Sequence, residues 1–124
     1  MIDHDEDIQL IRRTVDGYFK GTYQGDEAQL KRAFHPEARI TGIINGQFFD
    51  WTLTEFINRV TATPTAENKK EPYNKEILFI DRTNHAAMVK ARVLVGGLKV
   101  TDYITLLKIN GNWLIRHKSF TVEN

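Results

Sequence analysis

Hydrophobic residues near the start of the chain recur at spacings of three and four, which is typical of an amphipathic helix. They are Ile8, Ile11, Val15, Tyr18 and Phe19. The pattern predicts a helix from residue 8 to residue 23. Gly25 and Asp26 then introduce a second, shorter helix, for which the Asp26 carboxylate is the expected N-cap. Pro36 ends that helix, because the residue before a proline is pushed out of helical geometry.

The next hydrophobic segment predicts a β-hairpin. Residues 38–44 are rich in isoleucine and precede Asn45 and Gly46, the preferred pair for a two-residue hairpin turn. Residues 47–49 are therefore expected to form a short return strand.

A third helix is predicted directly after this hairpin. Thr52 or Thr54 begins it, and Glu55 stands three residues after Thr52, the spacing of a capping box. Pro64 lies just beyond its expected end. The polar, unperiodic residues 65–72 that follow are predicted to form an exposed loop.

The second half of the chain consists of four apolar runs separated by turn signals. The runs are 73–82, 85–95, 99–109 and 113–122. The pairs between them, Thr83-Asn84, Gly96-Gly97 and Asn110-Gly111, are compatible with hairpins. We therefore expect an antiparallel meander and an α+β fold whose helices come mostly first. Its 124 residues fit one domain, 1–124.

Composition and charge exclude several classes of protein. Seventeen basic and sixteen acidic residues leave a formal charge of +1 without a basic stripe, so no nucleic-acid partner is predicted. Cysteine is absent, which fits a reducing cytoplasm. The acidic start does not have the pattern of a signal peptide, and no apolar run reaches the ~20 residues of a membrane span. A cytoplasmic protein without a membrane partner is expected.

The sequence offers no pattern for a metal or a cofactor. The histidines His4, His35, His85 and His117 are widely separated and lack the spacing of helical zinc sites. The glycines stand at expected turns and strand ends instead of forming a phosphate-binding loop. We therefore predict neither a metal nor a cofactor.

Two segments carry a resemblance to a known family. One runs from Gly25-Asp26 to Phe34-His35-Pro36-Glu37-Ala38, and the other covers residues 107–115. Together with the element order, they resemble the nuclear transport factor two-like superfamily over nearly the whole chain, and most closely its putative lumazine-binding proteins. The resemblance implies three N-terminal helices packed in a strongly curved, mostly antiparallel sheet that forms a cone with one pocket. It also implies a homodimer that pairs through the outer face of the sheet.

Ketosteroid isomerase shares that fold and suggests which residues to compare. Tyr18 matches the position of its hydrogen-bonding tyrosine. Asp102 lies near the position of its neutral acid. Gly42, however, falls where its catalytic base stands, and glycine cannot accept a proton. The resemblance therefore argues against isomerase chemistry of that type.

The orientation of the side chains on the last two strands decides which residues reach the pocket. If Lys108 faces outward, Tyr103 faces inward and Asp102 is a solvated strand residue; a slip of one residue reverses this assignment. On the last strand, Arg116 and Lys118 prefer water, which turns Trp113 and His117 inward.

Three functions remain open. The first is binding of a small apolar or aromatic molecule in an apolar pocket. The expected lining is Tyr18, Phe34, Phe56, Tyr103, Trp113 and His117. The alternative is an isomerase- or cyclase-type enzyme acting on a small carbonyl compound, with Tyr18 as hydrogen-bond donor and His117 or Asp102 as proton carrier. His117 has a competing interpretation as a hydrogen-bonded wall residue. The third function is a protein interaction module.

Overall fold

The computed structural model describes residues 3–123, with three helices and six strands. The elements are α1 (Asp3–Gln24), α2 (Glu27–Ala33), β1 (Phe34–Ile44), β2 (Gln47–Thr52), α3 (Leu53–Thr61), β3 (Lys75–Thr83), β4 (Ala86–Val95), β5 (Leu98–Ile109) and β6 (Asn112–Val122). The order predicted from the sequence is confirmed throughout.

The side chains expected to cap the starts of α2 and α3 do so in the structure. The Asp26 carboxylate accepts a hydrogen bond from the Gln29 amide at 3.1 Å and caps α2. Thr52 and Glu55 form the reciprocal capping box of α3. Of the two threonines considered for this position, Thr52 is the cap.

The strand β1 begins earlier than predicted, at Phe34 instead of residue 38. Pro36 therefore lies inside a strand. It is tolerated there because pairing with β6 is interrupted between Phe34 and Arg39, where the missing amide hydrogen costs no sheet hydrogen bond. In the same stretch, His35 Nδ1 accepts a hydrogen bond from the Glu37 amide at 3.0 Å.

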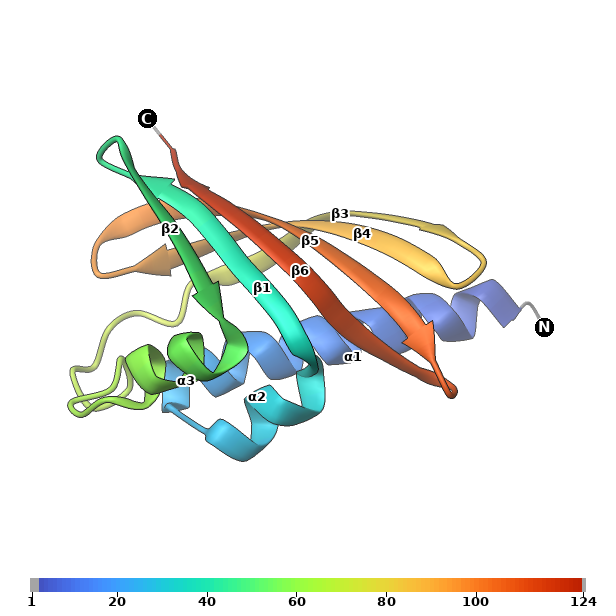
Figure 1. Cartoon of the computed structure of the whole chain (residues 1–124), viewed down its shortest axis with the longest axis horizontal. Coiled ribbons are helices and arrows are strands. Elements are labelled where there is room, and N and C mark those ends of the chain that lie inside the picture. The colour runs from blue at the N-terminus through green and yellow to red at the C-terminus, as the bar shows by residue number, and fades with distance from the viewer. Residues whose placement is uncertain (1–2, 124) are drawn as a thin grey trace.

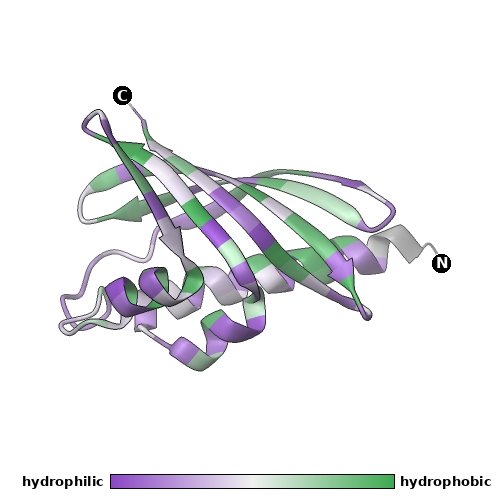
Figure 2. Ribbon diagram, viewed as in Figure 1, coloured by the Kyte–Doolittle hydropathy of each residue, from purple (hydrophilic) through white to green (hydrophobic). Residues whose placement is uncertain are grey.

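The six strands form one unclosed, curved sheet in the order β2, β1, β6, β5, β4, β3. All neighbours are antiparallel except β1 and β6, which are parallel. The three helices lie on the concave side of this sheet, with α1 running along its length (Figure 1). The strands show alternating hydrophobic and hydrophilic bands in Figure 2, as expected where side chains point to opposite faces in turn.

The core lies between α1 and the concave face of the sheet. Ile11, Val15, Tyr18 and Phe19 of α1 are buried there, as the helical periodicity predicts. They pack with alternate residues of β4, such as Val89. In the residues that the structure describes, no helix has both the length and the apolar character of a membrane span.

An ion cluster closes one end of this core. The Asp7 carboxylate accepts hydrogen bonds from the Trp113 indole at 2.9 Å and from the Lys108 ammonium at 3.0 Å. Arg82 approaches the same carboxylate at 3.5 Å. Lys108 therefore faces inward, and the prediction that it faces outward is wrong. The contact with Asp7 is the physical reason, because it pairs the lysine charge on the inner face.

The hydrogen bond from Trp113, and then that from Lys108, lowers the pKa of Asp7. A lowered carboxylate pKa stabilises the fold above the ordinary value of about 3.9, and this stabilisation is lost as the pH falls through the lowered value. We therefore expect Asp7→Asn to be less sensitive to acid than the wild type. Urea unfolding between about pH 6 and pH 3 measures this difference. Identical pH profiles for the two proteins would contradict this role of Asp7.

Candidate functional site

A cavity of about 480 Å³ lies between the concave face of the sheet, α1, α3 and the connecting segment of residues 62–74. Its apolar lining consists of Ile44, Trp51, Phe56, Val60, Val93, Leu94, Val95, Val100 and Phe120. Its polar lining consists of Tyr18, Thr22, Arg59, Glu71, Lys75, Asp102 and Lys118. A mostly apolar cavity of this size with a few convergent polar groups is typical of small-molecule sites.

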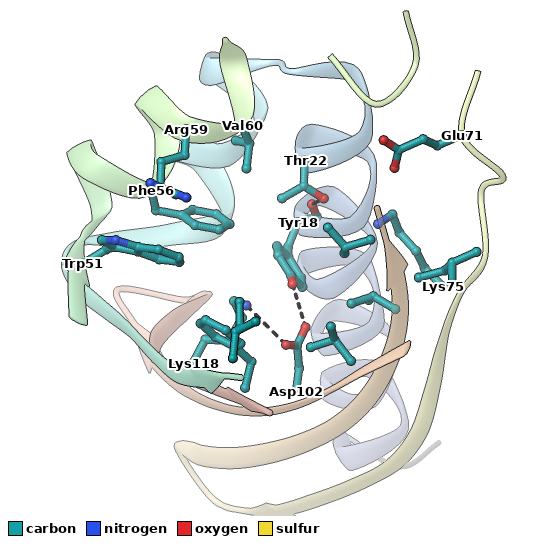
Figure 3. Close-up of a pocket in the computed structure, with 16 residues that line it drawn as sticks. Tyr18, Thr22, Trp51, Phe56, Arg59, Val60, Glu71, Lys75, Asp102 and Lys118 are labelled. Atoms are coloured by element: carbon teal, nitrogen blue, oxygen red, sulfur yellow. Dashed lines mark hydrogen bonds and ion pairs between the residues drawn. The ribbon is translucent and has the colours of Figure 1, made fainter. Parts of the chain in front are cut away.

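Three polar side chains meet in the wall of this cavity (Figure 3). The Tyr18 hydroxyl of α1 donates a hydrogen bond of 2.6 Å to Asp102 Oδ2 on β5. The Lys118 ammonium of β6 donates to Asp102 Oδ1 at 3.2 Å. Asp102 is completely buried and Lys118 is only 4% exposed. Each carboxylate oxygen therefore has its own donor, as a buried charge requires.

Burial raises the pKa of the Tyr18 hydroxyl well above its ordinary value, and the charge of Asp102 and the hydrogen bond to it act in the same direction. Tyr18 therefore keeps its proton at neutral pH and acts as a donor. Its proton is already directed at Asp102, so the group that Tyr18 offers to a ligand is the acceptor side of its hydroxyl oxygen.

The Lys118 ammonium is surrounded by aromatic rings as well as by Asp102. It lies 4.7 Å from the Phe120 ring centroid, 5.2 Å from that of Tyr18 and 5.4 Å from that of Phe56. Ring faces attract cations at these distances. One of its three hydrogens is used by Asp102, which leaves donor capacity on the side of the cavity.

A β-bulge explains why Lys118 points inward. The pairing of β5 with β6 shifts between Thr105 and Leu106, so that Ile115 and His117 oppose consecutive residues of β5. The extra residue, Arg116, reverses the alternation of side chains along β6. Before the bulge Ile115 is buried, and after it Lys118 and Phe120 are buried.

The inward position predicted for His117 is wrong for this reason. His117 lies on the outer face, where its Nε2 is 3.2 Å from the hydroxyls of both Thr41 and Ser119. This placement removes His117 from the cavity, so it is hydrogen-bonded but is not part of the pocket wall.

The inward position predicted for Tyr103 is also wrong. Tyr103 is 46% exposed on the outer face, where the Lys90 ammonium stands 5.6 Å from its ring centroid. Asp102 takes the inward place. Sequence reasoning assumed that a charged strand residue seeks water, whereas Asp102 is neutralised by Lys118 and satisfied by Tyr18.

The remaining predicted residues divide between the cavity and the core. Tyr18 and Phe56 line the cavity. Phe34 is buried behind them and packs edge-on against the Tyr18 ring at 5.7 Å. Trp113 does face inward, but it lies at the Asp7 end of the core and does not line the cavity.

The stacked rings of Phe120 and Trp51 in the cavity wall depend on Gly42. A Cβ at this position would lie 2.5 Å from the Phe120 ring, so only glycine lets that ring pack against β1. The Phe120 ring in turn stacks on Trp51 at 5.8 Å, with an angle of 18° between the planes. Arg59 of α3 covers the Trp51 ring at 4.5 Å. No carboxylate stands at position 42, as the comparison with ketosteroid isomerase indicated.

Sequence reasoning missed four charged residues of the cavity lining, namely Lys118, Lys75, Arg59 and Glu71. A signal for Lys118 existed, because Asp102 and Lys118 are the members of a possible ion pair on strands predicted to be neighbours. Lys75 and Arg59 gave no comparable signal. Among the side chains of residues 6–123, no group of three or more His, Asp or Glu residues is arranged to hold a metal.

The sequence profile of a family described as "Putative lumazine-binding" matches residues 6–121. The chain belongs to this family. A curated relative, the aldolase FrzH of a Cladobotryum species, is 26% identical over 105 residues, which is 83% of this chain and 81% of that protein.

Solved structures of other proteins share the fold of this chain. A protein of unknown function from Silicibacter pomeroyi superposes with a TM-score of 0.89 at 24% identity, covering 99% of this chain and 100% of its own. Another from Methylobacillus flagellatus has a TM-score of 0.83 at 23% identity, covering 96% and 94% of the two chains. Both are described as NTF-2 like, which confirms the fold predicted from the resemblance.

Proposed function

We propose that this protein binds a small, mostly apolar or aromatic molecule in the cavity beside Lys118. The observation that supports the proposal is an apolar hollow of about 480 Å³ with an ion pair, Lys118 and Asp102, in its wall. The apolar surface supplies binding energy, and the few polar groups orient the ligand.

The charges of the lining indicate the polar end of the ligand. The lining has three basic side chains and two acidic ones, namely Arg59, Lys75 and Lys118 against Glu71 and Asp102. The carboxylate of Asp102 already accepts hydrogen bonds from two donors. The free hydrogens in the wall therefore favour a carbonyl, hydroxyl or carboxylate oxygen on an otherwise apolar molecule.

A second candidate function is catalysis on a small carbonyl compound in the same cavity. The specific observations in its favour are the similarity to an aldolase and the buried ammonium of Lys118, which is placed to stabilise a developing oxyanion. Asp102 would hold that ammonium in position. His117 has no part in this candidate, because it lies on the other face of the sheet.

A thermal-shift series tests the binding proposal, with naphthalenemethanol as the reference probe. A ligand at a hundred times its dissociation constant adds about 2.7 kcal/mol of stability, which is readily measured for a domain of this size. We expect Val60→Trp, which fills the cavity from α3, to abolish the shift. The matched control is Asn58→Trp on the exposed side of the same helix, which should leave it unchanged. An equal shift in both variants would place binding elsewhere.

A further inference from the structure

Lys75 is a lysine of the cavity that the ion pair of Lys118 and Asp102 does not use. It is the first residue of β3, where it pairs with Val93. Figure 3 shows its amine directed into the cavity from the side opposite Trp51 and Arg59. The Tyr73 ring centroid lies 6.0 Å from the amine.

The charged groups around Lys75 come from three elements. Asp102 of β5, Lys118 of β6 and Glu71 of the segment before β3 all act on it. The acid that α1 offers on this side, Asp16, is engaged with Lys20 at 2.9 Å. Glu71 accepts a hydrogen bond from the Gly96 amide and forms a salt bridge with Lys69 at 3.2 Å. Among the side chains of residues 6–123, no carboxylate lies within 4.0 Å of the Lys75 amine.

These surroundings make the Lys75 amine easier to deprotonate than that of an ordinary lysine. Burial lowers the pKa of Lys75, and the cation of Lys118 lowers it further, while Asp102 and Glu71 oppose the effect in part. A partly buried lysine in a mostly apolar cavity that also holds a second cation, here Lys118, has features of an activated amine nucleophile. Lys118 itself is held by its carboxylate partner at 3.2 Å and is not available for this role.

We propose that Lys75 is the nucleophile of this cavity and forms a reversible imine with a small aldehyde or ketone bound there. The inference rests on the proposed binding function and extends it by naming carbonyl compounds as the ligand class. The nitrogen lone pair of Lys75 attacks the carbonyl carbon and gives a carbinolamine. The carbon–oxygen bond then breaks, and the oxygen leaves as water with both amine hydrogens. A carbon–nitrogen double bond remains, and water reverses the reaction.

The experiment traps this imine with naphthaldehyde as probe and cyanoborohydride as hydride donor, followed by peptide mass spectrometry of the full chain. We expect the adduct at Lys75 to form about tenfold faster, or more, than at the exposed Lys99, because binding holds the carbonyl beside the amine. Raising the pH should reduce this advantage, since it deprotonates exposed lysines as well.

Two variants separate reactivity from folding. Lys75→Met and Lys75→Arg should both lose the rapid adduct, and the arginine variant keeps the positive charge while its guanidinium forms no imine under these conditions. Lys99→Met is the control and should trap like the wild type. Adducts spread evenly over the lysines, or rapid trapping that persists in both Lys75 variants, would overturn the proposal.

Naphthalenemethanol, which cannot form an imine, distinguishes failure of this proposal from failure of the proposed function. If the alcohol stabilises the protein but no adduct accumulates at Lys75, imine formation is refuted and binding stands. If neither occurs, both proposals are refuted.

Discussion

Replacing Lys118 by methionine is expected to lower the free energy of unfolding by about 3–5 kcal/mol, the usual cost of removing one partner from a buried ion pair. Methionine keeps much of the side-chain volume, so the loss is mainly electrostatic. It leaves the completely buried Asp102 carboxylate with Tyr18 as its remaining donor. Against a typical total stability of about 5–15 kcal/mol, such a loss is readily detected by urea denaturation.

Two further variants show whether the uncompensated charge causes the effect. Lys99→Met removes an exposed lysine on the neighbouring strand β5 and should cost no more than about 0.5 kcal/mol. Adding Asp102→Asn to Lys118→Met removes the stranded charge and should recover a substantial part of the loss. A double variant less stable than Lys118→Met would show that the pair is not coupled in this way.

Replacing Tyr18 by phenylalanine is expected to cost about 1.5–3 kcal/mol, the range for a hydrogen bond to a charged group. The ring keeps its contacts with Phe34 and Phe56, and only the 2.6 Å hydrogen bond to Asp102 is lost. The effect falls on folding stability, because the Tyr18 proton serves Asp102 and not a ligand. Chemical denaturation measures it.

The matched control for this substitution is Tyr103→Phe, which removes an exposed hydroxyl from the outer face of the sheet. Its stability should stay within about 0.5 kcal/mol of the wild type. Equal losses for Tyr18→Phe and Tyr103→Phe would argue against the buried hydrogen bond as a stabilising contact.

Local sequence signals were sufficient to predict most of the fold. Asp26 and the pair of Thr52 and Glu55 mark helix starts through side-chain hydrogen bonds that span only three residues. Asn45 and Gly46 both adopt positive φ in the first hairpin turn, as this dipeptide does readily. The turn before β4 shifted by one residue to Asn84 and His85, within the usual uncertainty of an element boundary.

Local sequence signals do not predict which side chains of β5 and β6 point to the concave face of the sheet. This orientation depends on contacts between distant parts of the chain. The bulge at Arg116 has no local sequence marker, yet it moves His117 out of the interior and Lys118 into it. The rule that charged residues face water fails at Asp102 and Lys118, whose charges neutralise each other. Tyr18 was identified because its helical position does not depend on strand register.

The proposed ligand should occupy the hollow beside Lys118 and Asp102. Proton–nitrogen correlation spectra recorded while naphthalenemethanol is added test it most directly. We expect the largest shift changes at the Trp51 indole and at the amides of Val93, Asp102 and Lys118, all of which belong to the cavity lining. Changes centred instead on Tyr103, His117 and Ser119 of the outer face would contradict it.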